Sequence, residues 1–469
     1  MTMRTVITGG TLVTADGASP MDILVQDEKV AALAAGFSGL SETWKQGADI
    51  VFDATGRYVV PGGIDAHTHM DMPFGGTTSA DTFETGTRAA AWGGTTMIID
   101  FAIQTKNESL LAGMDTWQAK ADGACAVDYS FHAIISDVTE ASLKEMDELV
   151  AQGVTSFKLF MAYPGVFYST DKDILRSMDR SAGNGALIMM HAENGIAIDA
   201  IVAAAIGRGQ TDPIYHGLTR PAELEGEATF RAIRLAQVTR SPLYVVHVSS
   251  APALEAIVEA RDRGQNVFAE TCPQYLFLSE EDMARPGFEG AKFVCTPPLR
   301  PREHQAALWR GLRTDDLSVV ATDHCPFCFA EQKELGVGDF TKIPNGLPGV
   351  ENRMDLIFQG VVSGEISLAR WVEVTSTNPA KMFGLFPRKG AIAPGSDADI
   401  VIYDPAGEQT ISATTHHMAV DYSCYEGLRI KGHVDTVFSR GRQIIGAGAY
   451  TGEPGHGRFV PRQLSQHLR

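Results

Sequence analysis

The chain has 469 residues, and its 44% hydrophobic and 20% charged content is ordinary for a large globular domain accompanied by a smaller one. The formal net charge of −18 at pH 7 argues against a nucleic-acid partner, which requires a basic face. No uncharged apolar run approaches the roughly 18 residues of a membrane span, and the N-terminus lacks the apolar core of a signal peptide.

Both ends of the chain show an all-β pattern. The first 58 residues predict short strands between turns, at Thr5–Ile7, Thr11–Val13, Asp22–Gln26, Lys29–Leu33 and Ile50–Asp53. Similar runs return at Gly390–Ile392, Ala398–Tyr403, Thr436–Ser439 and Arg442–Ile445. Neither piece has enough strands for a core of its own. We therefore expect residues 1–58 and 386–469 to form one small β-sandwich domain, with an extended polar tail from Tyr450 that packs on a neighbouring subunit.

Residues 59–385 alternate apolar runs with helical segments. Eight runs qualify as buried strands: Val59–Ile64, Thr96–Phe101, Tyr129–Ile135, Ser156–Met161, Leu187–Met190, Leu243–Val248, Val267–Glu270 and Leu317–Ala321. The helical segments include Thr82–Trp92, Ser142–Gln152, Lys172–Asn184, Glu225–Val238 and Pro252–Arg263. This α/β alternation is typical of a parallel sheet covered on both faces, and eight units predict a (β/α)8 barrel. An open, doubly wound sheet is the alternative.

Side chains that can bind a metal stand at or near the ends of five of these runs. They are His67, His69, Lys158, His191, His247 and Asp323. The carboxyl ends of barrel strands meet at one mouth, so these residues are expected to converge there. An open sheet has one crevice at its switch point, which poorly explains why the ligand candidates lie on five different strands. Taken singly, each histidine could be a hydrogen-bonded core residue, and Asp323 could be only a helix cap.

Lys158 lies inside the apolar run Phe157–Met161. A buried ammonium costs several kcal/mol unless it is compensated, so burial favours the free amine. A free amine can add carbon dioxide, and the resulting carbamate is an anionic ligand with two oxygens that can bridge two cations. The plainer alternatives are a snorkelling lysine or a buried ion pair.

Four histidines, one aspartate and a carboxylated lysine make the ligand set of a site for two divalent metal ions. Nitrogen and oxygen ligands without cysteine favour zinc, and manganese or cobalt also fit. Such ions activate water as a nucleophile at neutral pH. We expect His324 to support Asp323 from outside the ligand set. Cys325 and Cys328 are expected to be packing residues, because no second pair completes a structural zinc site.

Four motifs resemble the amidohydrolase superfamily and, within it, the cyclic amidases dihydropyrimidinase and D-hydantoinase. They are Gly62–His69, Lys158–Tyr163, Ala321–Pro326 and Lys342–Gly346, and the similarity spans essentially the whole chain. The resemblance implies a metal-dependent hydrolase barrel with a β-sandwich made from both termini. It also implies hydrolytic opening of cyclic ureides, either dihydropyrimidines such as dihydrouracil or 5-substituted hydantoins.

The resemblance assigns roles to individual residues. His67 and His69 would hold one metal ion with Lys158 and Asp323, and His191 and His247 the second, with carboxylated Lys158 as the bridge. Asp323 would act as general base and then general acid, and Tyr163 would donate to the developing oxyanion. Asn345 and Thr296 would hold the ureide edge of the substrate. The apolar gate for the exocyclic group would consist of Phe74, Phe160, Tyr163 and Phe167.

The sequence departs from the family pattern at one of these positions. Thr296 precedes Pro297-Pro298 where the family usually has serine. The contacts made there are largely through the backbone in this family, so we expect function to survive.

Related activities remain as alternatives. Dihydroorotases place an arginine two residues after the second histidine, where Asp71 stands here. Allantoinases would show the same metal ligands. Some relatives are non-catalytic scaffolds that have lost ligands, whereas all six ligand positions are present here.

The expected partner is a small-molecule ureide, with neither nucleic acid nor membrane as a partner. A homotetramer is expected from the family. Six cysteines are too few for a disulfide scaffold, so we expect a cytoplasmic protein with reduced thiols.

Overall fold

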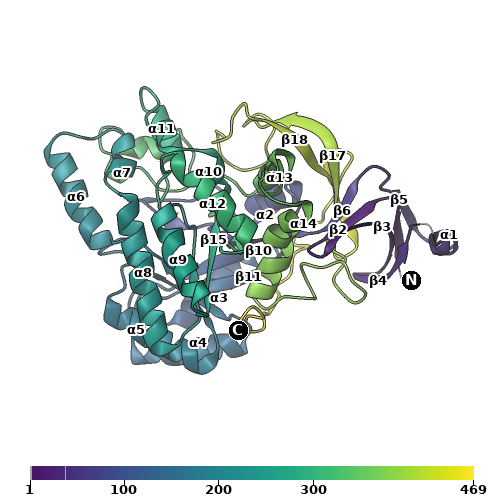
Figure 1. Ribbon diagram of the computed structural model, residues 1–469, viewed down its shortest axis with the longest axis horizontal. Coiled ribbons are helices and arrows are strands. Elements are labelled where there is room, and N and C mark those ends of the chain that lie inside the picture. Colours follow the sequence, from purple (N-terminus) through teal and green to yellow (C-terminus); the bar gives the residue numbers. More distant parts are fainter. Residues whose placement is uncertain (1–2, 37, 469) are drawn as a thin grey trace.

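Two sheets organise the computed structural model, which describes residues 3–36 and 38–468. An eight-stranded parallel sheet forms the barrel, and a ten-stranded sheet combines the two terminal segments. Figure 1 shows the purple N-terminal strands beside the yellow strands β17 and β18, on one flank of the barrel. The predicted (β/α)8 barrel with a β-sandwich from both ends is confirmed.

The barrel strands follow one another in chain order. They are β7 (Gly63–Thr68), β10 (Thr95–Ile103), β11 (Asp128–Ile134), β12 (Ser156–Phe160), β13 (Leu187–His191), β14 (Leu243–Val245), β15 (Val267–Thr271) and β16 (Val319–Val320). Almost every residue in them is buried, because helices cover the outside of the barrel and side chains fill its inside. This explains why the strands appear in the sequence as continuous apolar runs.

Helices cover the outside of the barrel (Figure 1). The longer ones are α2 (Phe83–Trp92), α3 (Leu110–Ala121), α4 (Glu140–Ala151), α5 (Asp171–Asn184), α6 (Gly195–Gly207), α8 (Ala222–Thr239), α9 (Ala251–Asp262), α12 (Glu303–Thr314) and α13 (Arg353–Ser363). Shorter ones are α1 (Leu40–Lys45), α7 (Ile214–Leu218), α10 (Pro273–Phe277), α11 (Glu280–Met283), α14 (Leu368–Val372) and α15 (Asn378–Met382). The five predicted helical segments correspond to α2, α4, α5, α8 and α9. None of the helices in the described residues is long and apolar enough to cross a bilayer.

The predicted first barrel strand, Val59–Ile64, is wrong in its extent. The chain divides at Gly62: β6 (Tyr58–Pro61) pairs with β17 (Ile400–Thr410) in the terminal sheet, whereas β7 pairs with β10. A Cβ at Gly62 would lie 2.1 Å from the Thr96 side chain, so only glycine lets the chain pass so close to β10. The sequence did not show the division because the run Val59–Ile64 is apolar and buried on both sides of Gly62.

The barrel closes where β7 meets the segment after β16. Thr68 pairs with His324 in a parallel bridge, and the His69 amide donates to the His324 carbonyl at 2.8 Å. The ends of the first and last strands therefore lie side by side. This brings His67, His69 and Asp323 to the same part of the rim.

The terminal sheet packs around its own apolar cluster, which includes Ile23, Val59, Ile400 and Phe438. Its strands are β1 (Arg4–Thr8), β2 (Thr11–Thr14), β3 (Gly17–Gln26), β4 (Lys29–Ala35), β5 (Ile50–Asp53), β6, β17, β18 (Arg429–Ser439), β19 (Arg442–Gly446) and β20 (Ala449–Tyr450). The short pair β8 (Pro73–Phe74) and β9 (Thr77–Thr78) stands apart. The strand predicted at Gly390–Ile392 is absent, because the chain bends at Gly390, where φ is 73°.

A buried ion cluster joins the two sheets. Lys389 donates to Asp128 at the start of β11 and to Asp399 just before β17, each at 2.6 Å. Its ammonium also lies 3.0 Å from Asp397. All four side chains are almost fully buried, so the lysine neutralises carboxylates that would otherwise be costly in this interior.

The tail beyond Tyr450 packs on the barrel of its own chain, a contact that the sequence did not predict. The Val460 amide donates to the Tyr129 carbonyl at 2.8 Å, and Arg462 donates to the side chain of Ser130 at 3.0 Å. Both partners lie near the start of β11, so the tail covers the amino-terminal end of the barrel, opposite the rim with the metal-binding side chains.

Candidate active site

One cavity gathers every residue that the sequence singled out for chemistry. It is lined by His67, His69, Phe74, Lys158, Phe160, Tyr163, Phe167, His191, His247, Thr296, Asp323 and Asn345, together with Met72, Cys325 and Gly346. The ligand candidates come from β7, β12 and β13 and from the segments directly after β7, β14 and β16. The cavity therefore lies at the carboxyl ends of the barrel strands, where enzymes of this architecture place their chemistry.

Three residues of this cavity have a left-handed backbone that is unusual for non-glycine residues. The φ angles are 60° at Tyr163, 40° at His247 and 53° at Asp323. Such conformations cost about 1–3 kcal/mol each and persist where the surroundings hold them for a function. No helix begins after Asp323 before Lys333 in the described chain, so the alternative of Asp323 as a helix cap does not apply.

Glu270, at the end of β15, fixes the orientation of His67. Its carboxylate accepts from His67 Nδ1, from the Tyr244 hydroxyl at 2.8 Å and from the His247 amide at 3.3 Å. With Nδ1 bound to Glu270, His67 directs its Nε2 at the cavity. Sequence reasoning missed Glu270. The available signal was a carboxylate at the end of a predicted buried strand, where an unpaired charge would be costly.

Glu193 orients His191 in the same way. The His191 Nε2 lies 2.8 Å from the Glu193 carboxylate, and both side chains are buried. Burial opposes ionisation of Glu193, but His191 outweighs that effect and lowers the pKa of the carboxyl group. The Nδ1 of His191 is then the nitrogen left for the cavity. Glu193 stands two residues after His191 and was also missed.

Asp323 lies between two histidines. Its Oδ1 is 3.1 Å from His67 Nε2 and 3.2 Å from His69 Nε2. Burial opposes its ionisation, but the two imidazoles outweigh burial and keep its pKa well below the usual range. Asp323 is therefore a carboxylate at neutral pH, which suits either a metal ligand or a proton acceptor.

Lys158 is buried, with 1% of its surface exposed. Its ammonium lies over the rings of Phe101 and Phe160, 4.7 and 5.0 Å from their centroids. Burial lowers its pKa to about 8, and the carboxylates of Asp323 and Glu270 oppose that shift only in part. A sizeable fraction of free amine near neutral pH is the condition that carbamate formation requires.

Four aromatic side chains form the outer part of the cavity. Phe160 and Phe167 stack with centroids 5.0 Å apart, and Phe74 meets the edge of Tyr163 at 5.5 Å. Burial raises the pKa of the Tyr163 hydroxyl, so it stays protonated and able to donate a hydrogen bond. This arrangement gives the cavity an apolar entrance and one phenolic donor.

The comparisons with known proteins identify the family. The chain matches the amidohydrolase family over residues 58–444. It belongs to this family. It is 64% identical, over the whole of both chains, to a D-hydantoinase from Streptomyces coelicolor. It is 50% identical to a D-hydantoinase from Geobacillus stearothermophilus, over 98% of this chain and 97% of that protein.

The fold agrees with that assignment. The crystal structure of dihydropyrimidinase from Brevibacillus agri matches with a TM-score of 0.96 and 49% identity, covering 99% of both chains. The resemblance to the cyclic amidases predicted from four motifs is therefore confirmed, and the chain is a hydrolase of that class.

The donor set of this amidohydrolase suits divalent cations. His67, His247 and Asp323 place ligand atoms within 4.8 Å of one another. Within the described residues, the buried His67 Nε2 and His247 Nδ1 have no hydrogen-bond partner. Buried polar atoms without a hydrogen-bond partner are rare unless an ion or a water molecule binds them. The arrangement therefore supports metal dependence, as membership of the family does.

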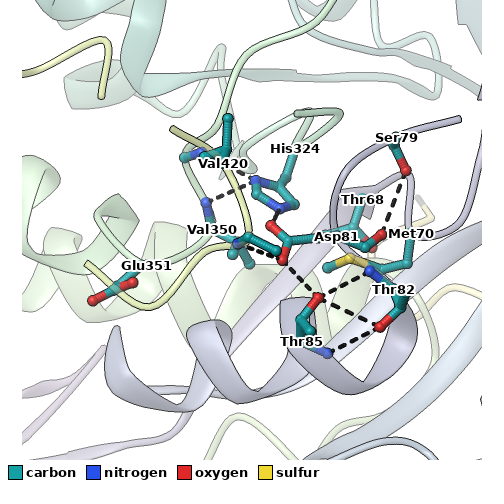
Figure 2. Close-up of polar contacts among 12 residues, drawn as sticks. Thr68, Met70, Ser79, Asp81, Thr82, Thr85, His324, Val350, Glu351 and Val420 are labelled. Carbon is teal, nitrogen blue, oxygen red and sulfur yellow. Dashed lines mark hydrogen bonds and ion pairs between the residues drawn. The ribbon is translucent and has the colours of Figure 1, made fainter. Parts of the chain in front are cut away.

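His324 lies outside the cavity lining, and its predicted support of Asp323 stays a prediction. Figure 2 shows its ring directed at Asp81, whose carboxylate lies 2.9 Å from Nε2. Asp81 also accepts from the Thr85 hydroxyl at 2.7 Å and from the Ala419 amide at 2.9 Å. Asp81 thus links the segment after β16, the start of α2 and the loop before β18.

Three further side chains lie near the proposed substrate contacts, and only the place of His216 was not expected. Cys325 is buried and lines the cavity, and Cys328 is partly buried outside the cavity lining, which agrees with packing roles. His216, which the sequence gave no role, lies under Thr296, with Nε2 3.3 Å from its hydroxyl and 2.8 Å from the Cys295 carbonyl. His216 stands on α7, outside any strand end, so its position was not readable from the pattern.

Proposed function

We propose that the chain hydrolyses the ring amide of D-5-substituted hydantoins, with dihydropyrimidines such as dihydrouracil as further substrates. The observation that carries this proposal is the single cavity in which six potential metal ligands, a phenolic donor, Asn345 and an aromatic entrance come together. The names of the relatives support the hydantoin class and the D configuration.

The site would hold two divalent ions, most naturally zinc, with manganese or cobalt as alternatives. The first would be held by His67, His69 and Asp323, and the second by His191 and His247, with carboxylated Lys158 between them. When bound, the ions polarise the ring carbonyl and provide a nucleophilic oxygen from water at neutral pH. The low pKa of Asp323, the lowered pKa of Lys158 and the oriented imidazoles of His67 and His191 support this assignment.

The chain itself would bind the ring and move one proton. Asp323 is ionised and takes a proton from the attacking water at its carboxylate, then returns it to the ring nitrogen as that nitrogen leaves. Tyr163 stays protonated and donates its hydroxyl hydrogen to the oxygen that gains negative charge. Asn345 and Thr296 would hold the ureide edge and set the ring against Asp323.

Phe74, Phe160, Tyr163 and Phe167 would receive the exocyclic group. Each ring lies within 6.4 Å of at least two of the others, measured between centroids. A planar apolar substituent would bury its surface against them. The entrance therefore supports substrates with aromatic or apolar 5-substituents over bare rings.

Organisation beyond the site is also proposed. Residues 1–58 and 386–469 would form one domain together with the rest of β6, and the remainder of residues 59–385 the barrel, with the exchange near Gly62. Most of α6 faces outward, with Ile196 56% and Ile206 37% exposed, which supports a homo-oligomer, expected to be a tetramer.

All six cysteines are free thiols, which supports a cytoplasmic location.

Hydrolysis assays on the zinc-loaded enzyme test the substrate class. D-5-phenylhydantoin, dihydrouracil and allantoin should be compared by kcat/KM, and the hydantoin should be preferred. Preference for allantoin would replace the proposal by the allantoinase alternative. A purified chain that binds no metal and stays inactive after supply of metal and bicarbonate would instead support a non-catalytic scaffold.

A further inference from the structure

Lys333 is a buried lysine that the proposed mechanism does not use. It begins a short 3-10 helix, Lys333–Gly336, and none of its surface is exposed. Its ammonium donates to three backbone carbonyls: Pro344 at 2.7 Å, Val294 at 2.9 Å and Gly346 at 2.9 Å. Each of its three N–H bonds therefore has an acceptor, which offsets much of the cost of burying the charge.

The three carbonyls belong to the two segments that would hold the ureide edge. Pro344 and Gly346 flank Asn345 on both sides, and Val294 stands two residues before Thr296. The Gly346 amide also donates to the Val294 carbonyl at 3.0 Å, so the two segments are joined directly behind the cavity. One ammonium thus holds the backbone on both sides of Asn345 and the backbone two residues before Thr296.

We propose that Lys333 is a positioning residue for substrate binding: its ammonium holds the segments 294–296 and 344–346 in register, so that Asn345 and Thr296 meet the ureide edge together. This inference rests on the proposed function for the roles of those two residues. It concerns how tightly the ring is held, because Lys333 does not line the cavity and touches none of the proposed metal ligands.

A purely structural lysine and a positioning lysine predict different kinetics. Loss of stability alone lowers the amount of active enzyme and leaves the KM of the folded fraction unchanged. If the two segments instead shift relative to each other, the enzyme binds the substrate ring less tightly, so KM rises while kcat changes little. If Lys333 acts through Asn345, its removal also costs less once Asn345 has been truncated.

The experiment compares Lys333→Met, Asn345→Ala and the double variant in the zinc-loaded enzyme, with 5-phenylhydantoin as substrate. Lys333→Gln, which keeps two N–H donors, is made in parallel so that a soluble variant is available. Lys144→Met, on the exposed face of α4, is the control for loss of a lysine. Bound zinc, melting temperature, kcat and KM are measured for each.

We expect Lys333→Met to raise KM about ten-fold or more, with kcat within about three-fold and zinc content unchanged. Lys333→Gln should show a smaller rise. In the Asn345→Ala background, the rise caused by Lys333→Met should shrink to less than about three-fold. A KM within about two-fold of wild type in both Lys333 variants, or fully additive effects in the double variant, would overturn the inference. Wild-type enzyme that opens no cyclic ureide would overturn the proposed function itself, a distinct result.

Discussion

The imidazole of His324 is held in one tautomer by Asp81 and two backbone amides. Its Nε2 lies 2.9 Å from the Asp81 carboxylate, and its Nδ1 accepts from the amides of Gly349 at 3.1 Å and Val350 at 3.3 Å. A ring nitrogen that accepts from N–H donors carries no proton, so the proton is on Nε2 and is donated to Asp81. Since His324 follows Asp323 directly, this network holds the backbone that presents the proposed proton-transferring carboxylate.

Asp81→Ala should therefore damage turnover more than metal binding. The variant leaves the buried Nε2–H of His324 and the Ala419 amide without their acceptor, at a cost of about 1–3 kcal/mol. The freed segment then presents Asp323 less accurately, and we expect kcat to fall about ten-fold or more. Steady-state kinetics with metal analysis measure both effects. Asp16→Ala, which removes an exposed carboxylate between β2 and β3, is the control, and identical kinetics in the two variants would disprove the coupling.

Glu270→Gln tests the orientation of His67. The amide keeps the size of the side chain but removes the charge that accepts from His67 Nδ1. Outer partners of this kind are worth about 10- to 100-fold in metal affinity, so zinc should bind that much more weakly. Competition with a chelator gives the dissociation constant. Glu259→Gln, on the exposed side of α9, serves as the comparison. Unchanged zinc affinity in Glu270→Gln would show that the tautomer of His67 is set elsewhere.

Lys158→Ala should abolish metal binding and turnover together. The variant removes the proposed bridge, and the remaining imidazoles and carboxylate cannot replace an anionic ligand shared by two ions. Metal content of the purified protein and hydrolysis of 5-phenylhydantoin are measured on the same sample. Lys144→Ala controls for the loss of a surface lysine. Turnover at the wild-type level in Lys158→Ala would refute the carbamate.

The sequence predicted the residues that face the cavity better than the residues behind them. His191 and Asp323 are recognisable because burying a polar side chain at the end of an apolar run costs free energy unless that side chain has a binding partner or a functional role. Glu270 ends a buried strand in the same way, but its partner His67 lies 203 positions away, and only the closed barrel brings them together. The division at Gly62 was not predicted because the residues on both sides of it are buried, so the hydrophobic pattern shows no change there.

Phe167→Ala should change specificity more than catalysis. The Phe167 ring stacks on Phe160, with centroids 5.0 Å apart, and its removal opens the apolar entrance. Loss of a buried aromatic contact costs about 1–3 kcal/mol of binding, so KM for 5-phenylhydantoin should rise about ten-fold or more. Dihydrouracil has no exocyclic group, and its KM should change by less than about three-fold. The KM values for both substrates are measured in parallel. An equal rise in KM for the two would contradict the role of Phe167 in receiving the exocyclic group.

The ion cluster between the sheets should make stability depend on acid pH. Burial opposes ionisation of Asp397, but Lys389 and Lys29 outweigh it and lower its pKa from 3.8 to about 2. A carboxyl group whose pKa is lower in the folded state stabilises the fold above pH 3.8, and that contribution is lost as the pH falls towards 2. Asp397→Asn should therefore lower the unfolding free energy by about 1–2 kcal/mol at pH 7 and by about half as much at pH 3. Melting temperatures of wild type and variant between pH 7 and 3 measure the difference, with Asp16→Asn as the surface control. A difference that stays constant over this range would mean that Asp397 contributes through its hydrogen bonds and not through its charge.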